Sequence, residues 1–479
     1  MAKNLARVEA LLQPRGTIQR VRSIVLAESI SIVGIPLVSD RNESIESAMS
    51  RLENTAYELG VTVVRDESAL RELLPELIRT RSEQIWGFGR GLAQGADDPI
   101  EIWKKLVAQL QPIPVEGTTI GVFRGFLNGL HPRNPALASS MLDDAIDDNA
   151  LAQFYPMLET SIGTIEQSGF QRLIRSLNHG SAPIHMYRTL QAGGVTHHLK
   201  GSMFNELLLR ISDRYAGVDI AIEILIMRLS FGQESSTPGE LVEIGCELFR
   251  RLKVTGNTDS NFVYRLQIVG KNCLLGEKGA TTVSEICSNL RDAISRSEAS
   301  TYGHRDLLQV LFSAQPFAVL QSLCGGDDAA MARVGIGILE SSDLLRPHAF
   351  DVIPVEALLR WCDELPEVRY PIAAAGISAI KQDKDGPHWT DIALKILEKS
   401  PDRPRVLQKF IRQFSLPGWD SSKAAEVQSN LRLLDEMAKY SDPRLEEFAS
   451  QEKARLSQAT AAVKEAIPPV YLDQYESFE

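Results

Sequence analysis

Several features are missing from this sequence of 479 residues, and the first is a long apolar run. The longest membrane-like stretch covers only residues 32–38, whereas a helix needs about 20 apolar residues to span a bilayer. The opening residues, MAKNLARVEALLQP, have no continuous apolar core and do not have the pattern of a signal peptide. We therefore expect a soluble, cytoplasmic protein with no membrane contact.

Cysteine is scarce and irregularly spaced. The chain has 5 cysteines, an odd number, and no two have the C-x-x-C spacing that is typical of zinc and redox sites. Four of them lie within apolar patterns of helical period, at Cys246, Cys273, Cys287 and Cys362. These positions predict buried, reduced thiols and no disulfide framework.

Positive charge is in deficit. The formal net charge is −11 and the isoelectric point is near 5.4, which argues against a protein that grips nucleic acid over its whole surface. The first 24 residues are an exception, since Lys3, Arg7, Arg15, Arg20 and Arg22 face only one acidic residue, Glu9. This segment is either a solvated helix or a contact for an acidic partner or a phosphate backbone.

Sharp catalytic motifs are absent as well. The sequence has no phosphate-binding P-loop, no H-E-x-x-H, no paired Cys/His zinc spacing, no G-x-S-x-G and no kinase motif set. We therefore predict no catalytic residue, no cofactor and no metal ligand, and favour a non-enzymatic protein. An enzyme remains an alternative, with a site built from scattered residues of segments 1–80 and 254–302.

Two weaker signals each have two interpretations. A dense run at Gly87, Gly89, Gly91 and Gly95 falls inside a helical pattern, so we interpret it as close helix packing and not as a phosphate cradle. The pair His197 and His198 stands beside Lys200 without an acidic residue or cysteine at ligand spacing. These three residues are either exposed side chains between helices or a cationic contact for a partner.

What the sequence does contain is an apolar pattern, F-x-x-Φ-Φ-x-x-Φ, that returns along residues 85–225. Strong copies begin at Phe123, Phe170 and Phe204, and a weaker one begins at Ile85. After each strong copy a polar break precedes a second apolar helix, which begins at Leu137, Ile184 and Val218. Each copy therefore predicts a helix–turn–helix unit.

The spacing of these units is that of a helical repeat array. The starts at residues 85, 123, 170 and 204 are 38, 47 and 34 residues apart. A helix pair has two apolar faces and buries only one by itself, so stacked neighbours would form one continuous core. The longest interval predicts an added helix or loop, for which Asp147–Leu158 is the candidate.

Residues 1–80 read differently. A short helix is expected at 5–12, and residues 24–38 are rich in Ile and Val, as strands are. A helix at 45–59 should end at Gly60, a β-branched run follows at 61–64, and Asp66 should cap a helix over 69–78. We favour a small α/β element here over an all-helical cap, although two strands cannot form a sheet core.

The remainder divides by the regularity of its helical pattern. Residues 81–230 form the array and residues 231–302 an irregular helical middle, with turn-rich stretches GQESSTPGE, VTGNTDSN and LLGEKGATT. Helix pairs resume over 303–466, where Gly325–Asp328 reads as a turn with an aspartate cap and Trp389 and Trp419 read as packing anchors. Residues 467–479 are a polar, acidic tail.

The C-terminal pairs resemble HEAT repeats. Asp442-Pro443-Arg444 followed by Phe448-Ala449 resembles the turn and second helix of that repeat, and so does Pro366-Glu367-Val368-Arg369 followed by Ala373-Ala374-Ala375. The resemblance covers the last third of the chain clearly and residues 85–230 loosely. It implies a mainly α fold, an α-solenoid of stacked helix pairs.

These patterns together lead us to expect a scaffold or sensor that binds a macromolecular partner, a protein above all. The candidate contacts are Arg20, Arg22, His197, His198 and Lys200. One alternative is a regulatory subunit or fragment of a larger bacterial defence system, because the degenerate repeats resemble those attached to NTPase- or nuclease-containing proteins of that kind. A nucleic-acid-binding solenoid is another.

Overall fold

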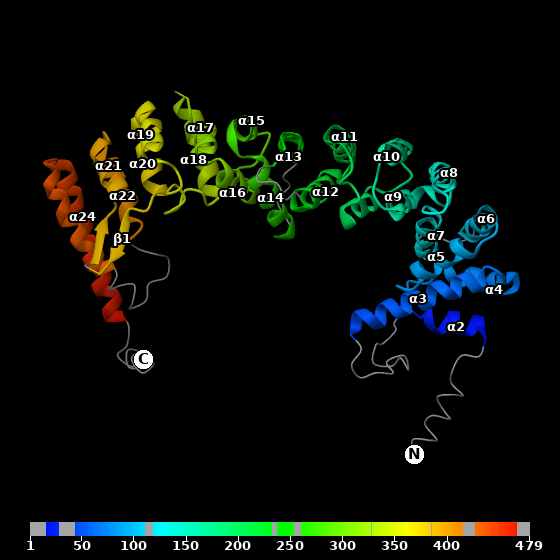
Figure 1. The fold of residues 1–479 in the computed structure, drawn as a ribbon. Helices are drawn as coiled ribbons and strands as arrows, with labels where there is room; N and C mark the ends of the chain where they lie inside the picture. Colours follow the sequence, from blue (N-terminus) through cyan, green and yellow to red (C-terminus); the bar gives the residue numbers. More distant parts are fainter. Residues whose placement is uncertain are drawn as a thin grey trace, which may run out of the picture. The chain divides into compact units, whose positions relative to one another are not determined.

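The computed structural model describes residues 16–27, 44–110, 118–231, 237–252, 260–326, 328–384, 386–414 and 427–466. This part of the chain is mainly α-helical, and its only sheet is a two-stranded hairpin, so the predicted mainly α class is confirmed. The chain divides into two compact units, residues 1–244 and 245–479, with the division inside helix α13 (Gly239–Arg251). Figure 1 shows the elements of each unit.

The first unit begins with the helices α2 (Thr17–Ile24), α3 (Ile45–Val63) and α4 (Glu67–Leu77). Asp66 caps α4 as predicted, because its Oδ1 accepts hydrogen bonds from the backbone N–H groups of Ser68 and Ala69, each at 3.1 Å. The expected helix at 5–12 and residues 28–38 of the expected strand lie outside the described residues.

The strand predicted at 61–64 is wrong, and so is the helix end at Gly60. Helix α3 continues through Gly60 to Val63, whose side chain is fully buried. The β-branched run is helical because burial of one face outweighs its modest helix propensity. The described residues between 16 and 78 therefore contain helices in place of the favoured α/β element.

Glycines determine how closely the next helices approach. An ideal Cβ on Gly60 would lie 2.2 Å from the carbonyl oxygen of Phe88 in α5 (Ile85–Gly95), and one on Gly91 would lie 2.0 Å from that of Tyr57. On the opposite side of α5, a Cβ on Gly125 of α7 (Gly121–Leu130) would lie 2.2 Å from the carbonyl oxygen of Trp86. Only glycine permits these contacts, so the packing interpretation of the glycine run is confirmed.

The helices of the first unit form two rows. The remaining elements are α6 (Pro99–Leu110), α8 (Pro135–Ala145), η2 (Ala152–Phe154), α9 (Tyr155–Glu159), η3 (Thr160–Ile162), α10 (Gln167–His179), η4 (Ile184–Gly194), α11 (Gly201–Ser212) and α12 (Gly217–Phe231). In one row α3, α5, α7, α9, η4 and α12 each contact the next. In the other row α4 contacts α6, α10 contacts α11, and side chains join α8 to α10.

The added helix predicted between residues 147 and 158 is present as η2 and α9. It has a consequence that the sequence pattern concealed. The Phe123 copy of the pattern lies in α7, in the first row, whereas the Phe170 and Phe204 copies lie in α10 and α11, in the second. Similar apolar patterns therefore occupy different rows before and after the insertion.

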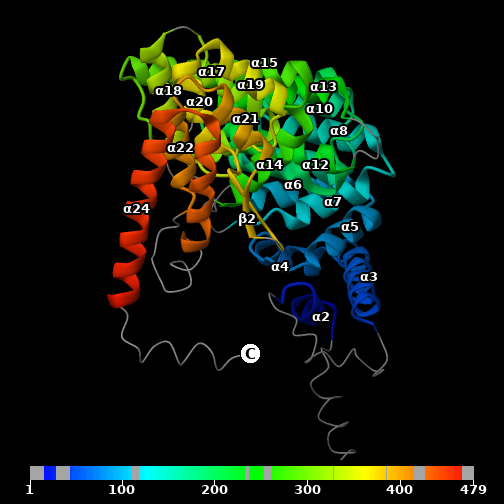
Figure 2. The same cartoon turned by 90° about the vertical axis from the view of Figure 1, so that its left-hand side faces the viewer.

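The second unit also has two rows, which can be followed in Figures 1 and 2. Its helices are α14 (Ser260–Cys273), α15 (Gly276–Ser295), α16 (Arg305–Ala314), α17 (Pro316–Cys324), α18 (Ala329–Ser341), α19 (Val355–Glu364), α20 (Pro366–Gly376), α21 (Asp391–Lys399), α22 (Arg403–Ile411), η5 (Leu431–Tyr440) and α24 (Pro443–Ala466). In one row α15, α17 and α19 are in contact in that order. In the other row α18 contacts α20, α20 contacts α22, and α22 contacts α24. Helix α14 contacts α16.

Some of the local predictions for this unit are confirmed and one is wrong. The stretch LLGEKGATT is not a long loop, because Gly276, with φ of +71°, turns the chain directly into α15. Asp328 caps α18 as predicted, with its Oδ1 accepting from the N–H groups of Ala330 and Met331. The helix pairs expected over residues 303–466 include α19/α20, α21/α22 and η5/α24, whose members are in contact.

A hairpin that the sequence reading missed follows α20. Strands β1 (Ile380–Asp383) and β2 (Gly386–Trp389) are antiparallel, with Ile380 opposite Trp389. The Asp-Gly pair at 385–386 was the available signal. Trp389 is a packing anchor as predicted: it is 5% exposed and its indole N–H donates to the carbonyl of Leu433 at 3.1 Å. Trp419 lies outside the described residues.

One kind of hydrogen bond recurs between neighbouring helix pairs. A long side chain donates to a backbone carbonyl near the end of a helix in an adjacent pair, 31 to 41 residues away in sequence. Examples are Arg133 to Ala93, Arg214 to Leu177, Gln315 to Leu274, Arg291 to Ser322 and Gln413 to Ile377. The last carbonyls of a helix have no partner within it, so these bonds satisfy them and join the pairs.

Candidate functional site

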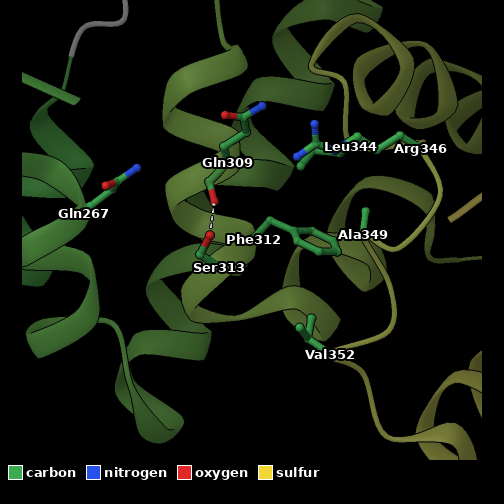
Figure 3. A pocket seen from close by; sticks show the side chains of 8 residues that line it. All are labelled: Gln267, Gln309, Phe312, Ser313, Leu344, Arg346, Ala349 and Val352. Carbon is green, nitrogen blue, oxygen red and sulfur yellow. Dashed lines mark hydrogen bonds between the residues drawn. The ribbon is translucent and has the colours of Figure 1, made fainter. Parts of the chain in front are cut away.

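The second unit has an open cleft of about 330 Å³ on its surface. Figure 3 shows that three elements line it: α14, α16 and the loop of residues 342–354 that follows α18. The apolar part consists of Phe312, Leu344, Ala349 and Val352. Phe312 and Leu344 are buried, and the Phe312 ring stacks on Phe350 with the centroids 5.7 Å apart. The floor of the cleft is therefore apolar, and its side chains are held in place by packing.

The rim of this cleft is polar. Gln267 of α14 and Gln309 of α16 project towards it, and the Ser313 hydroxyl donates to the backbone carbonyl of Gln309 at 2.8 Å. Within the described part of the chain, the side-chain amides of Gln267 and Gln309 have no hydrogen-bond partner. Each amide therefore offers both a donor and an acceptor to a ligand.

The charge at one side of the cleft is positive. Asp343 lies between two arginines, with Oδ2 2.9 Å from a guanidinium nitrogen of Arg305 and 3.2 Å from one of Arg346. One carboxylate between two guanidinium groups leaves one positive charge in excess. The Arg346 side chain is 57% exposed, so it can reach an anionic group of a ligand.

The loop that forms one wall is clamped from behind. The Ser378 hydroxyl contacts both His348 Nδ1 and Asp351 Oδ2, and the backbone N–H of Ser378 donates to Asp351 Oδ1 at 2.8 Å. The N–H of Phe350 donates to the carbonyl of Gly376 at 2.9 Å. These bonds fix the 342–354 loop against the segment after α20.

This serine, histidine and aspartate do not form a catalytic triad. In a triad the histidine lies between the other two and relays the proton. Here the serine hydroxyl touches both partners directly, and Asp351 also binds a backbone N–H. The arrangement is that of a loop clamp.

A strip of arginines and aromatic rings crosses three helices of the first unit. The guanidinium of Arg90 lies 5.9 Å from the ring centre of Tyr57, and that of Arg124 lies 5.0 Å from that of Trp86. Arg90 is paired with Glu53 at 3.1 Å. Among the described residues Arg124 has no carboxylate partner, and burial lowers its pKa. An uncompensated, partly buried cation favours an anionic ligand.

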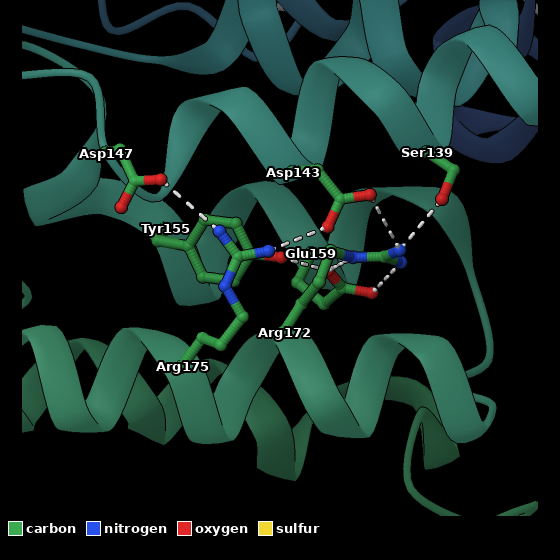
Figure 4. Close-up of polar contacts among 7 residues, drawn as sticks. All are labelled: Ser139, Asp143, Asp147, Tyr155, Glu159, Arg172 and Arg175. Atoms are coloured by element: carbon green, nitrogen blue, oxygen red, sulfur yellow. Dashed lines mark hydrogen bonds and ion pairs between the residues drawn. The ribbon is translucent and has the colours of Figure 1, made fainter.

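The most deeply buried ion pair of the first unit is structural. Arg172 and Glu159 are 4% and 1% exposed, and they form two parallel hydrogen bonds of 2.8 Å (Figure 4). The second Glu159 oxygen also accepts from the Tyr155 hydroxyl, and Arg172 donates to Ser139. Burial, followed by the Glu159 charge, raises the pKa of Tyr155. The polar groups of this buried cluster thus bind one another.

The sequence-predicted contacts are not among the residues that form these surfaces. Arg20 and Arg22 are exposed on α2, where the Arg22 guanidinium pairs with Glu76 at 2.6 Å and with Glu72 at 3.0 Å. These two carboxylates offset its charge. Helix α2 is the only described part of the basic N-terminal segment.

The other predicted contacts are adjacent to one another on the surface. His197 and His198 are exposed in the turn before α11. Lys200, which is also exposed, is the N-cap residue of that helix. Arg228 supports this turn by donating to the carbonyls of Thr196 and Leu199. Burial, and then the charge of Arg228, lowers the pKa of His197.

Metal and thiol chemistry find no support in the described residues. No three of their His, Cys, Asp or Glu side chains come together in a way that could hold a metal ion. All five cysteines are buried and free, as predicted, and burial raises the pKa of Cys273, Cys287 and Cys324 to about 12. None of the described helices is long and apolar enough to cross a membrane.

Sequence reasoning did not find the cleft. Its residues come from three segments that only tertiary packing brings together, and Gln267 and Gln309 carry no motif. A comparison with known proteins adds no identity, since no family model, curated protein or solved structure matches this chain.

Proposed function

We propose that this chain is a HEAT-like α-solenoid, a non-enzymatic scaffold or sensor that binds another protein. The two rows of helices in each unit and the bonds between pairs 31 to 41 residues apart support the solenoid. The most deeply buried ionic groups described above, Arg172 and Glu159, satisfy each other and are not free for catalysis, which favours a binding role.

The observation that carries the proposal is the cleft of the second unit. It combines an apolar floor with two unengaged amides and an exposed apolar side chain, Val352, which is 68% exposed. A few polar groups around an apolar hollow are typical of binding sites. Its place on a row of helices is where solenoids commonly present a binding surface.

A capture experiment with matched variants tests this proposal. The tagged full chain is incubated with its native lysate, with and without nuclease, and stoichiometric partners are quantified by mass spectrometry. Val352→Glu places a charge in the cleft, and Leu275→Glu places one on an apolar residue that is 58% exposed and does not line it. We expect a protein partner that Val352→Glu loses and Leu275→Glu retains.

Two outcomes would count against the proposal. Equal recovery of the partner by both variants would mean that binding does not use the cleft. Turnover of a substrate by the purified, monodisperse chain would contradict a non-enzymatic scaffold.

Nucleic acid is the second candidate partner, and the Arg124 strip is the observation that favours it. Guanidinium groups interleaved with aromatic rings can contact phosphates and bases. Fluorescence anisotropy with labelled single-stranded RNA and DNA should then show binding that weakens as salt rises, and that Arg124→Gln reduces. Binding that is independent of salt, or unchanged in Arg124→Gln, would remove this candidate.

A further inference from the structure

We infer that the cleft of the second unit receives an extended peptide segment in which an acidic residue stands next to an apolar one. This inference rests on the proposed function, because it names the kind of protein segment that the scaffold would bind. Three features of the cleft carry it: the unpaired amides on two adjacent helices, the small volume above a buried apolar floor and the exposed guanidinium of Arg346.

The two amides belong to neighbouring helices that both line the cleft. Gln267 and Gln309 come from α14 and α16, which are in contact. Packed helices lie about 8–10 Å apart, and residues two or three positions apart in an extended chain are separated by about 7–10 Å. Two carboxamides on packed helices can therefore pair with N–H and C=O groups along one extended peptide that crosses both helices.

The size of the cleft limits what enters it. The whole cleft, with its polar rim, has a volume of about 330 Å³, which is at the small end of ligand sites, so it accommodates one or two side chains. A docked helix would need a longer groove for anchors at i, i+3, i+4 and i+7. An apolar side chain of the peptide would cover Val352, which is 68% exposed to water, and would lie over the buried floor at Phe312.

The positive charge of Arg346 favours an acidic residue next to the apolar residue of the peptide. Arg305 and Arg346 share the single carboxylate Asp343, and an exposed ion pair of this kind exchanges partners at little cost. A peptide carboxylate can form two parallel hydrogen bonds with the Arg346 guanidinium. A nucleic acid fits less well, because the Phe312 ring is only 5% exposed and offers little surface on which a base could stack.

The clamp at Ser378 gives the site its rigidity. Arg346, Ala349 and Val352 all belong to the 342–354 loop, and the contacts of Ser378 with His348 and Asp351 hold that loop against the segment after α20. Ser378 is therefore a positioning residue for the cleft.

Selection from a random peptide library displayed on phage, against the immobilised full chain, tests the inference directly. We expect enriched peptides with Asp or Glu beside an apolar residue, and polarisation measurements of a labelled selected peptide should give its affinity. Gln309→Leu and Arg346→Gln should each weaken binding about tenfold, the loss expected for one or two hydrogen bonds. Arg360→Gln, at an exposed arginine outside the cleft, should leave it unchanged.

The possible results separate the inference from the proposed function. Enriched peptides without an acidic residue, or with affinity that is unchanged in Arg346→Gln, would overturn the inference. If the native partner still depends on Val352 in that case, the scaffold proposal stands without it. If Val352→Glu affects neither the selected peptides nor the native partner, both fail.

Discussion

At the scale of single residues, glycine decides how the first unit packs. Gly60, Gly91 and Gly125 lie where a helix backbone of the neighbouring element occupies the space of a side chain. The sequence pattern located the crowded glycines of α5 within a helix, which was enough to favour packing over phosphate binding. It could not identify which neighbour each glycine touches, because that depends on the crossing of α3, α5 and α7.

The first prediction concerns one of these glycines. Gly91→Ala should lower the free energy of unfolding by at least about 1–3 kcal/mol, because its Cβ would lie 2.0 Å from the carbonyl oxygen of Tyr57. Gly337→Ala is the matched control within helix α18, where an added Cβ meets nothing within 4 Å. That change should raise stability by about 0.5–1 kcal/mol. Urea unfolding followed by circular dichroism measures both, and equal effects would contradict the packing argument.

The second prediction concerns the buried pair of Glu159 and Arg172. Arg172→Met should destabilise the first unit by about 3–5 kcal/mol, because it leaves a carboxylate buried without its counter-charge. Adding Glu159→Gln should restore part of the loss. Arg175→Gln removes exposed ion pairs to Asp143 and Asp147 and should cost about 0–1 kcal/mol. The coupling is read from a double-mutant cycle in urea, and additive effects would show that the pair is not coupled.

At the scale of elements, local signals located most helix starts but not the rows. Asp66 and Asp328 were recognisable as caps because a carboxylate before an apolar helical pattern satisfies free N–H groups close to it in sequence. The continuation of α3 through Gly60 was not recognisable, because burial against α5 decides it. The hairpin at 380–389 depends on two short strands whose signal is a single Asp-Gly pair.

The third prediction follows from the Asp66 cap. The hydrogen bond from the Ser68 hydroxyl and the N–H of Ala69 lower the pKa of Asp66, so its carboxylate stabilises the fold above its unfolded pKa of about 3.9. That stability is lost as pH falls through the lower folded value. Asp66→Ala should therefore reduce Tm near neutral pH and have a smaller effect in strong acid.

Asp66→Asn is the control for this prediction, because its amide oxygen can still accept from the N–H groups of Ser68 and Ala69 at any pH. Its Tm should stay near that of the wild type at neutral pH. A constant difference between wild type and Asp66→Ala across the acid range would show that ionisation of Asp66 makes no contribution.

At the scale of the whole molecule, the two units contain different side chains whose exposure can be measured during unfolding. All five cysteines lie between residues 246 and 362, within the second unit, and all are buried. Trp86 and Trp103 lie in the first unit. Thiol labelling therefore reports opening of the second unit.

The fourth prediction uses these reporters. Native protein should react negligibly with Ellman's reagent at neutral pH, because the thiols are buried and those of Cys273, Cys287 and Cys324 have a pKa of about 12. The denatured chain should show five reactive thiols. Gly91→Ala should not speed native labelling, since stability in helical arrays is dominated by neighbouring pairs. Rapid labelling of the wild type would contradict the observed burial.

The sequence by itself determined the mainly α class, the caps, the buried thiols and the place of the added helix. These features depend on residues close together along the chain, through apolar period and local hydrogen bonds. Only the tertiary structure decided the two rows, the path of α3 and the cleft at Gln267, Gln309 and Arg346. Contacts between residues about forty positions apart create these features, and such contacts leave no pattern within any one helix.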